Sequence, residues 1–98
     1  MIAEIQCLPN PTGNADNKYV HIESAIAVIE GCGLTYEVDA LGTTVEGTPD
    51  EIWAVLRAAH EAAANAGAES VVSVIKLAEA APGREPVTIE SLTGKFRA

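Results

Sequence analysis

Residues 41–77 read LGTTVEGTPDEIWAVLRAAHEAAANAGAESVVSVIKL, and this run contains one complete strand–helix–strand unit. The start of its helix is the clearest local signal in the chain. Thr48 suits the N-cap, Pro49 suits the first helical position, and Glu51 suits the reciprocal capping position three residues after Thr48. The apolar pattern on either side of this cap predicts a strand over residues 41–46, a helix over 49–66 and a strand over 71–77.

The first forty residues repeat the same order of elements. Ala3, Ile5 and Cys7 alternate with polar residues, which is typical of a strand with one buried face. The pattern predicts a strand over residues 2–8, a helix over 17–32 and a strand over 34–38. The βαββαβ order predicts an α+β sandwich of the ferredoxin-like type, with a four-stranded antiparallel sheet in the order 4-1-3-2 and two helices on one face.

The first helix and the tail are less sharply defined. Asp16 or Asn17 is a suitable N-cap, and we expect the core stripe of the helix to consist of Tyr19, Ile22, Ile26 and Ile29. We treat residues 1–98 as a single domain. Its tail over residues 82–98 carries Pro82, Gly83 and Pro86 near its start, and the pattern predicts a short helix over 89–96. We expect part of this tail to be mobile or docked on a partner subunit.

The composition excludes several classes of function. The net charge of −8 disfavours nucleic acid and anionic membranes as partners, because an acidic surface repels phosphate groups. The cysteines, Cys7 and Cys32, are not spaced as a metal or redox motif, so we expect free thiols. The chain opens without a basic flank or a long apolar run. We therefore expect a cytoplasmic protein with no signal peptide and no membrane span.

The sequence offers little support for catalysis or metal binding. It has no HExxH motif, and neither cysteine stands near a histidine in the chain. His21 and His60 are isolated in the sequence. Isolated histidines have a structural or surface role several times more often than they bind a metal. We therefore predict neither an enzyme nor a metal site nor a bound cofactor. An enzyme of this fold would have to use His21 or His60 as its base.

The predicted strand order brings polar residues together on the sheet face that the helices leave open. If the first and third strands are antiparallel neighbours, Glu4 and Gln6 share this face with Thr44 and Glu46. One interpretation is a pocket for a small cationic or amidine-like ligand. The alternative is a solvated sheet face or a polar interface with another sheet.

Several short stretches resemble the small thiamine-binding (YkoF-like) family, long classed as a domain of unknown function. The resemblance covers residues 1 to about 77. It depends on the order and spacing of MIAEI at 1–5, Pro9, TG at 12–13, KYV at 18–20, GLTYE at 33–37, GTTVEG at 42–47, HE at 60–61 and GA at 67–68. No single motif among these decides the assignment.

The resemblance implies a protein that binds thiamine or its hydroxymethylpyrimidine part without chemistry, as a carrier, buffer or sensor. It also implies homodimers or homotetramers assembled through sheet surfaces. By their position, the resemblance implies that Tyr36, Thr43 and Glu46 bind the ligand, and that Thr12 and Gly13 shape a nearby loop. The alternative is an oligomeric interaction or regulatory module with no small-molecule ligand.

Strand geometry adds two further residues, Glu4 and Thr44, to the predicted ligand-binding set. The same geometry raises one conflict. Thr43 and Glu46 point to opposite faces of an ideal strand, so they line one pocket only if a bulge or a subunit contact intervenes.

Overall fold

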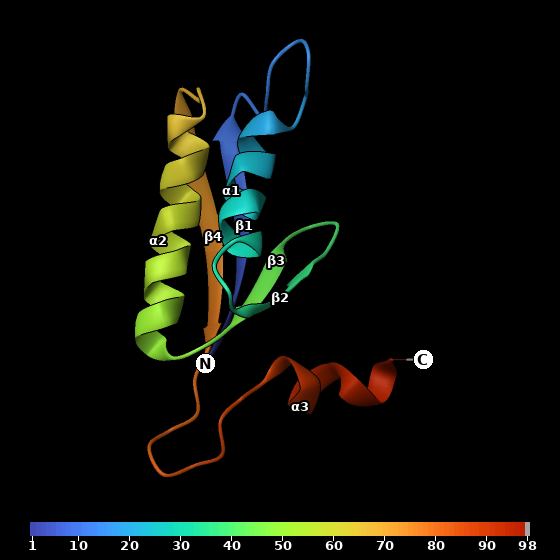
Figure 1. The fold of residues 1–98 in the computed structure, drawn as a ribbon, viewed down its shortest axis with the longest axis vertical. Coiled ribbons are helices and arrows are strands. Elements are labelled where there is room, and N and C mark those ends of the chain that lie inside the picture. The colour runs from blue at the N-terminus through green and yellow to red at the C-terminus, as the bar shows by residue number, and fades with distance from the viewer. Residues whose placement is uncertain (98) are drawn as a thin grey trace.

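The computed structural model describes residues 1–97 and consists of a four-stranded antiparallel sheet, in the order β2-β3-β1-β4, with α1 and α2 packed on one face (Figure 1). The α+β class is confirmed. The predicted strand order 4-1-3-2 is confirmed as well, since it is the same order read from the opposite edge of the sheet. The elements are β1 (Ile2–Asn10), α1 (Val20–Glu30), β2 (Thr35–Val38), β3 (Thr43–Glu46), α2 (Pro49–Asn65), β4 (Ser70–Ala78), α3 (Ile89–Thr93) and a 3₁₀ turn, η1 (Gly94–Phe96). Across residues 1–97, no helix is long and apolar enough to span a bilayer.

The central strand β1 organises the sheet, because both neighbouring strands pair with it. It pairs with β3 over its first residues only, up to the pair Ile5–Thr43, whereas it pairs with β4 as far as Asn10. The strand is thus two residues longer than predicted. Pro9 is tolerated within it because its nitrogen faces the side on which β3 has already ended, where no N–H donor is needed. The carbonyl of Asn10 accepts the N–H of Glu69 at 2.8 Å.

The core lies between the helices and one face of the sheet. Ala3, Ile5 and Cys7 of β1 point into it, together with Val45 of β3. The two helices complete it from the other side with residues that are all less than a tenth exposed: Ala25, Ile29, Ile52, Val55, Leu56, Ala59 and Ala63. The alternation along β1 therefore sends its odd-numbered side chains into the core and its even-numbered side chains to the open face.

The first helix differs from its prediction at both ends and along its buried stripe. It begins at Val20, because the side chain of Asn14 accepts the backbone N–H groups of Asp16 and Asn17 and holds them in a turn. Tyr19 lies outside the helix and is 58 % exposed, so its place in the core stripe was a wrong prediction.

The prediction missed two buried residues in this helix, His21 and Ala25. The buried residues are His21, Ala25 and Ile29, spaced four apart, while Ile22 and Ile26 are half-buried. The ring Nδ1 of His21 lies 2.7 Å from the carbonyl oxygen of Pro11. This contact satisfies a buried polar ring and ties the loop after β1 to the helix, so His21 has a structural role.

The tail contacts the chain's own sheet through α3 and Arg97. Docking of the tail on a partner subunit stays a prediction. From β4 the chain loops away from the body and returns as α3, which lies beside the end of the sheet near β2 and β3 (Figure 1). The side chain of Ile89 is 4 % exposed and anchors this helix. The capping residue Thr88 accepts the N–H of Ser91, and the Ser91 side chain reciprocates.

We expect Thr48→Ala to lower the free energy of unfolding by about 1 kcal/mol, measured by denaturant titration. The physical reason is the reciprocal cap of α2, in which Thr48 Oγ1 accepts the N–H of Glu51 and Glu51 Oε1 accepts the N–H of Thr48. This contact also lowers the pKa of Glu51. The matched control is Thr88→Ala, which removes the cap of the five-residue helix α3. A loss of equal size in both variants would contradict the view that α2, and not the tail, belongs to the cooperative core.

Candidate functional site

Four polar side chains form one row across the open face of the sheet. The strand register pairs Glu37 of β2 with Thr44 of β3, Thr44 with Glu4 of β1, and Glu4 with Lys76 of β4. Residues that face each other across an antiparallel ladder point to the same side. Because the odd-numbered residues of β1 are buried under the helices, this row lies on the opposite face. We call these four residues the polar row.

A shallow hollow of about 210 Å³ lies beside the polar row, lined by Ile2, Glu4, Thr44, Lys76 and Ala78, among others. The Lys76 ammonium lies 3.8 Å from Glu4 Oε1 and is largely exposed to solvent. An exposed pair of this kind contributes little to stability, so the carboxylate of Glu4 is available to another partner. The hollow thus combines a carboxylate acceptor with a neighbouring hydroxyl that donates or accepts.

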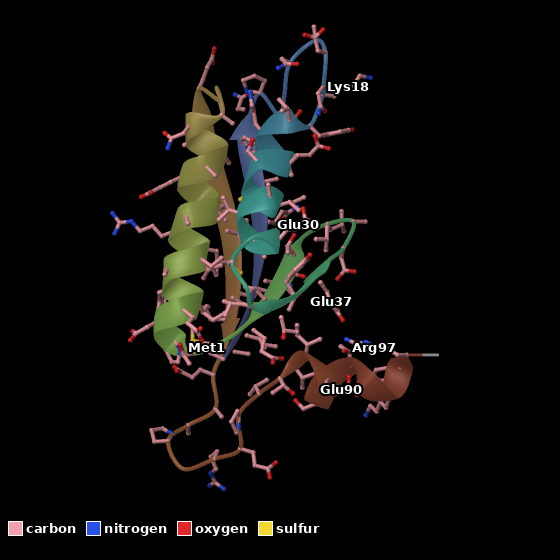
Figure 2. All side chains as sticks on the ribbon, viewed as in Figure 1. Met1, Lys18, Glu30, Glu37, Glu90 and Arg97 are labelled. Atoms are coloured by element: carbon pink, nitrogen blue, oxygen red, sulfur yellow. The ribbon has the colours of Figure 1, made fainter. Side chains whose placement is uncertain are left out.

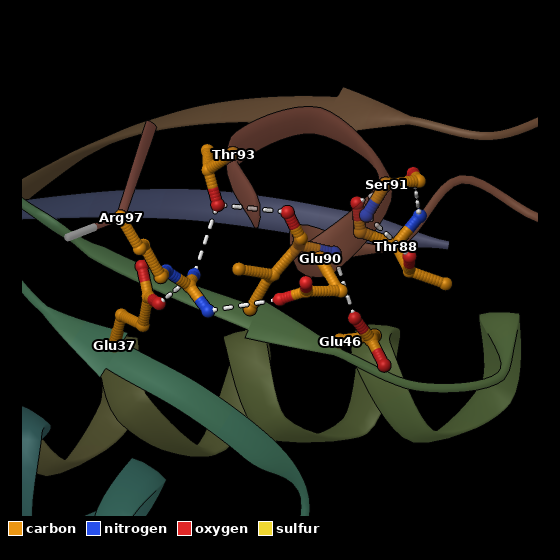
Figure 3. A network of polar contacts seen from close by, with 8 residues as sticks. Glu37, Glu46, Thr88, Glu90, Ser91, Thr93 and Arg97 are labelled. Carbon is orange, nitrogen blue, oxygen red and sulfur yellow. Dashed lines mark hydrogen bonds and ion pairs between the residues drawn. The ribbon is translucent and has the colours of Figure 1, made fainter. Parts of the chain in front are cut away.

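Glu46 lies one residue pair further along the same face, opposite Ile2, but its carboxylate is already engaged (Figure 3). Its Oε1 accepts the backbone N–H of Ile89 at 2.8 Å, at the start of α3. A ligand that used this oxygen would have to displace the tail.

The tail also neutralises the end of the polar row. Arg97 donates to Glu37 and Glu90 and to the hydroxyl of Thr93, so that one guanidinium bridges β2 and α3. Figure 2 shows Glu37, Glu90 and Arg97 gathered between the sheet and this helix. Two of the acidic residues on the open face, Glu37 and Glu46, are therefore held by the chain itself.

The remaining predicted residues lie elsewhere. Thr43 and Tyr36 point to the helix side of the sheet, since Thr43 pairs with the buried Ile5 and Tyr36 pairs with the buried Val45. No bulge reconciles Thr43 with Glu46, because the register of β3 is regular over all four of its residues. The expected conflict between their faces is therefore present in the structure.

The loop that carries Thr12 and Gly13 follows the far end of β1 and is remote from Glu46, which pairs at the near end. The hydroxyl of Thr12 donates to the carbonyl of Lys18 at 2.6 Å. A Cβ atom built on Gly13 would clash with the backbone carbonyl of Asn17, so no side chain fits there. Both residues stabilise the approach to α1.

Sequence reasoning missed Glu37, Lys76 and Arg97 as neighbours of this site. Glu37 could have been found, because alternation along its strand and the predicted strand order already place it beside Thr44. Lys76 was obscured by a strand that is apolar on both faces. Nothing in the sequence connects Arg97 to the sheet, because its contact with Glu37 spans sixty positions.

One hydrogen-bonded chain connects residues that the sequence presents as isolated. Ser73 Oγ lies 2.6 Å from Nδ1 of His60 and donates to the Cys7 sulfur at 3.6 Å. Burial raises the pKa of the Cys7 thiol, so it remains protonated at neutral pH and is a poor nucleophile. Over residues 1–97, no three His, Cys, Asp or Glu side chains are gathered in a way that could hold a metal ion.

Comparison with known proteins gives the family. A family model described as thiamine-binding protein matches residues 3–95. The chain belongs to this thiamine-binding protein family. A UPF0045 protein of Methanocaldococcus jannaschii is 35% identical over 79 residues, which is 81% of this chain and 76% of the relative.

Two solved structures share the fold of this thiamine-binding family member over almost its whole length. A domain of unknown function from Bacillus cereus has a TM-score of 0.84 and 32% identity, and covers 98% of this chain and 88% of its own. A putative thiamine biosynthesis/salvage protein from Thermotoga maritima has a TM-score of 0.81 and 26% identity. The match covers 98% of this chain and 97% of the Thermotoga chain. The resemblance seen in the sequence is confirmed.

We expect Arg97→Ala to release α3 from the sheet, because it removes the guanidinium that joins Glu37 to the helix. Hydrogen exchange at the Ile89 amide should accelerate, while the global free energy of unfolding changes by less than about 1 kcal/mol, as for other partly exposed ion pairs. Arg84→Ala, in the exposed loop before α3, is the control. An unchanged Ile89 amide in Arg97→Ala would mean that Glu46 and Ile89 hold the tail without Arg97.

Proposed function

We propose that this protein binds thiamine or a hydroxymethylpyrimidine related to it, without catalysis, in the hollow beside Glu4 and Thr44. The observation that supports the proposal most strongly is the coincidence of the family match with a polar row on an open sheet face. Carrier, buffer and sensor are all roles that such binding would serve.

The chemistry of the hollow suits the two rings of thiamine. The thiazolium ring carries a positive charge, which a carboxylate stabilises, and the aminopyrimidine ring offers an amino group that donates to a carboxylate. Glu4 supplies the acceptor, and the Thr44 hydroxyl supplies a second polar contact. The Lys76 ammonium would have to turn away, which its long and exposed side chain permits.

The proposal does not include a reaction. The Cys7 thiol is buried and protonated, and the Nδ1 of His60 is engaged by Ser73. His21 is likewise held by Pro11 and lies on the helix side of the sheet, away from the hollow. A base able to act on a bound ligand in the hollow would therefore have to come from the residues that line it, such as Glu4 or Lys76.

We expect Glu4→Gln to weaken thiamine binding about tenfold or more, because a hydrogen bond to a charged group contributes about 1.5–3 kcal/mol net. Isothermal titration calorimetry measures the affinity. Glu30→Gln, at the exposed end of α1, makes the same change of charge away from the sheet. Equal affinities in both variants would exclude Glu4 from the site. Glu46→Gln gives a second test. We expect this substitution to weaken binding only if the ligand displaces α3 and contacts the Glu46 carboxylate in its place.

A second candidate function is assembly through the open face, and one observation favours it. Leu8, Val72 and Val74 form an exposed apolar area beside the polar row, on the half of the face beyond the tail. We propose that a second copy of the chain covers this area in a homodimer or homotetramer. We expect Val72→Lys with Val74→Lys to reduce the mass measured by sedimentation, while Trp53→Lys, on the exposed flank of α2, leaves it unchanged. A monomeric wild-type protein would contradict this candidate.

A further inference from the structure

Three carboxylates surround one hydroxyl on the open face of the sheet. Thr44 of β3 pairs with Glu4 on one side and with Glu37 on the other. Glu46 follows two residues later on β3, so its side chain points to the same face. The Cβ atom of each glutamate therefore lies about 5–7 Å from that of Thr44. Like charges at this spacing repel one another unless positive or donor groups offset them.

The chain supplies donors to two of these carboxylates from residues 88–97, a segment that we call the strap (Figure 3). The backbone N–H of Ile89 donates to Glu46 Oε1 at 2.8 Å, and the Arg97 guanidinium donates to Glu37. A bound cation would direct its own donors at these same oxygens. The strap thus takes up carboxylates that a ligand on the open face would otherwise use.

Few contacts hold the strap on the sheet. Over residues 88–97, Ile89 alone is buried, while Leu92 and Phe96 are exposed. In the described chain, no backbone-to-backbone hydrogen bond joins the strap to the sheet. Its helix α3 has five residues, which is too short to persist as an isolated helix in water. The strap therefore belongs to the parts of the molecule that open at a low free-energy cost.

The connection between β4 and the strap allows the strap to leave the sheet. Residues 79–87 contain no helix or strand, and residues 81–86 are all exposed. One local hydrogen bond, from the Arg84 N–H to the Ala81 carbonyl, shapes this loop. Release of the strap therefore leaves β4 and its pairing with β1 unchanged.

We propose that the strap is an autoinhibitory segment that competes with a cationic ligand for Glu37 and Glu46. This proposal rests on the proposed function, because it concerns the regulation of the same open face. With the strap docked, the ligand has the Glu4 carboxylate alone, and with the strap released it gains the two other carboxylates around Thr44. Release of the strap therefore raises the affinity, and by linkage the ligand weakens docking of the strap by the same factor.

The test compares the thiamine affinity of the wild-type full chain with that of two variants, by isothermal titration calorimetry. Arg97→Ala removes the donor to Glu37, and Ile89→Ala removes the buried anchor without a change of charge. We expect Arg97→Ala to bind thiamine about threefold to fivefold more tightly, the factor that an exposed ion pair contributes. Ile89→Ala should bind at least as tightly as Arg97→Ala. Arg97→Ala decides the question if Ile89→Ala fails to fold.

A control and a second measurement separate strap release from a change of net charge. Lys95→Ala removes the same charge two residues away, where the ammonium lies over the Phe96 ring, and should leave the affinity unchanged. In the wild type, saturating thiamine should accelerate hydrogen exchange at the Ile89 amide about threefold to fivefold, because the coupling is reciprocal. Exchange at the core amide of Val55 should not accelerate.

Three outcomes would overturn the proposal. Equal thiamine affinities in the wild type, Arg97→Ala and Ile89→Ala, with unchanged exchange at Ile89, would exclude competition and leave the proposed function standing. A gain in Lys95→Ala as large as in Arg97→Ala would assign the effect to net charge. Absence of thiamine binding in the wild type and in both strap variants would overturn the proposed function, and this proposal with it.

Discussion

The register of β1 between its two neighbours is the constraint on which the rest of the structure depends. Because Ala3, Ile5 and Cys7 must be buried under the helices, Glu4 and Gln6 must face the open side. A slip of one residue would bury Glu4 and expose the core face, so the register is strongly specified. The polar row and the hollow beside it both follow from this one alignment.

The tail determines how much of the acidic face remains free. The amide of Ile89 uses one oxygen of Glu46, and Arg97 neutralises Glu37, so the chain supplies its own donors to two carboxylates. Glu4 has only a loose and exposed partner in Lys76. A cation therefore meets least competition at Glu4, although the family motif directs attention to Glu46.

Much of the fold could be predicted from sequence because its signals are local. The capping box at Thr48 and the alternation along β1 each depend on residues within one element, and both are present. Prediction was wrong where distant residues decide the outcome. His21 replaces Tyr19 in the buried stripe because it bonds Pro11, and that contact forms only in the folded chain.

The same contrast between local signals and long-range contacts applies to the candidate site. Alternation and strand order were sufficient to place Glu4 beside Thr44, whereas the capture of Glu46 by the tail depends on a docking contact across forty-three positions. The start of β3 could not be foreseen either, because residues 41–46 read as a strand and the structure begins β3 at Thr43.

We propose that the open face, and Glu4 within it, holds a positively charged vitamin. A crystal structure of the wild-type protein grown with thiamine tests this most directly. We expect density for the thiazolium and aminopyrimidine rings in the hollow, with a polar atom of the ligand within hydrogen-bond distance of Glu4. A hollow left without ligand at saturating thiamine, or thiamine density confined to another part of the chain, would exclude this site.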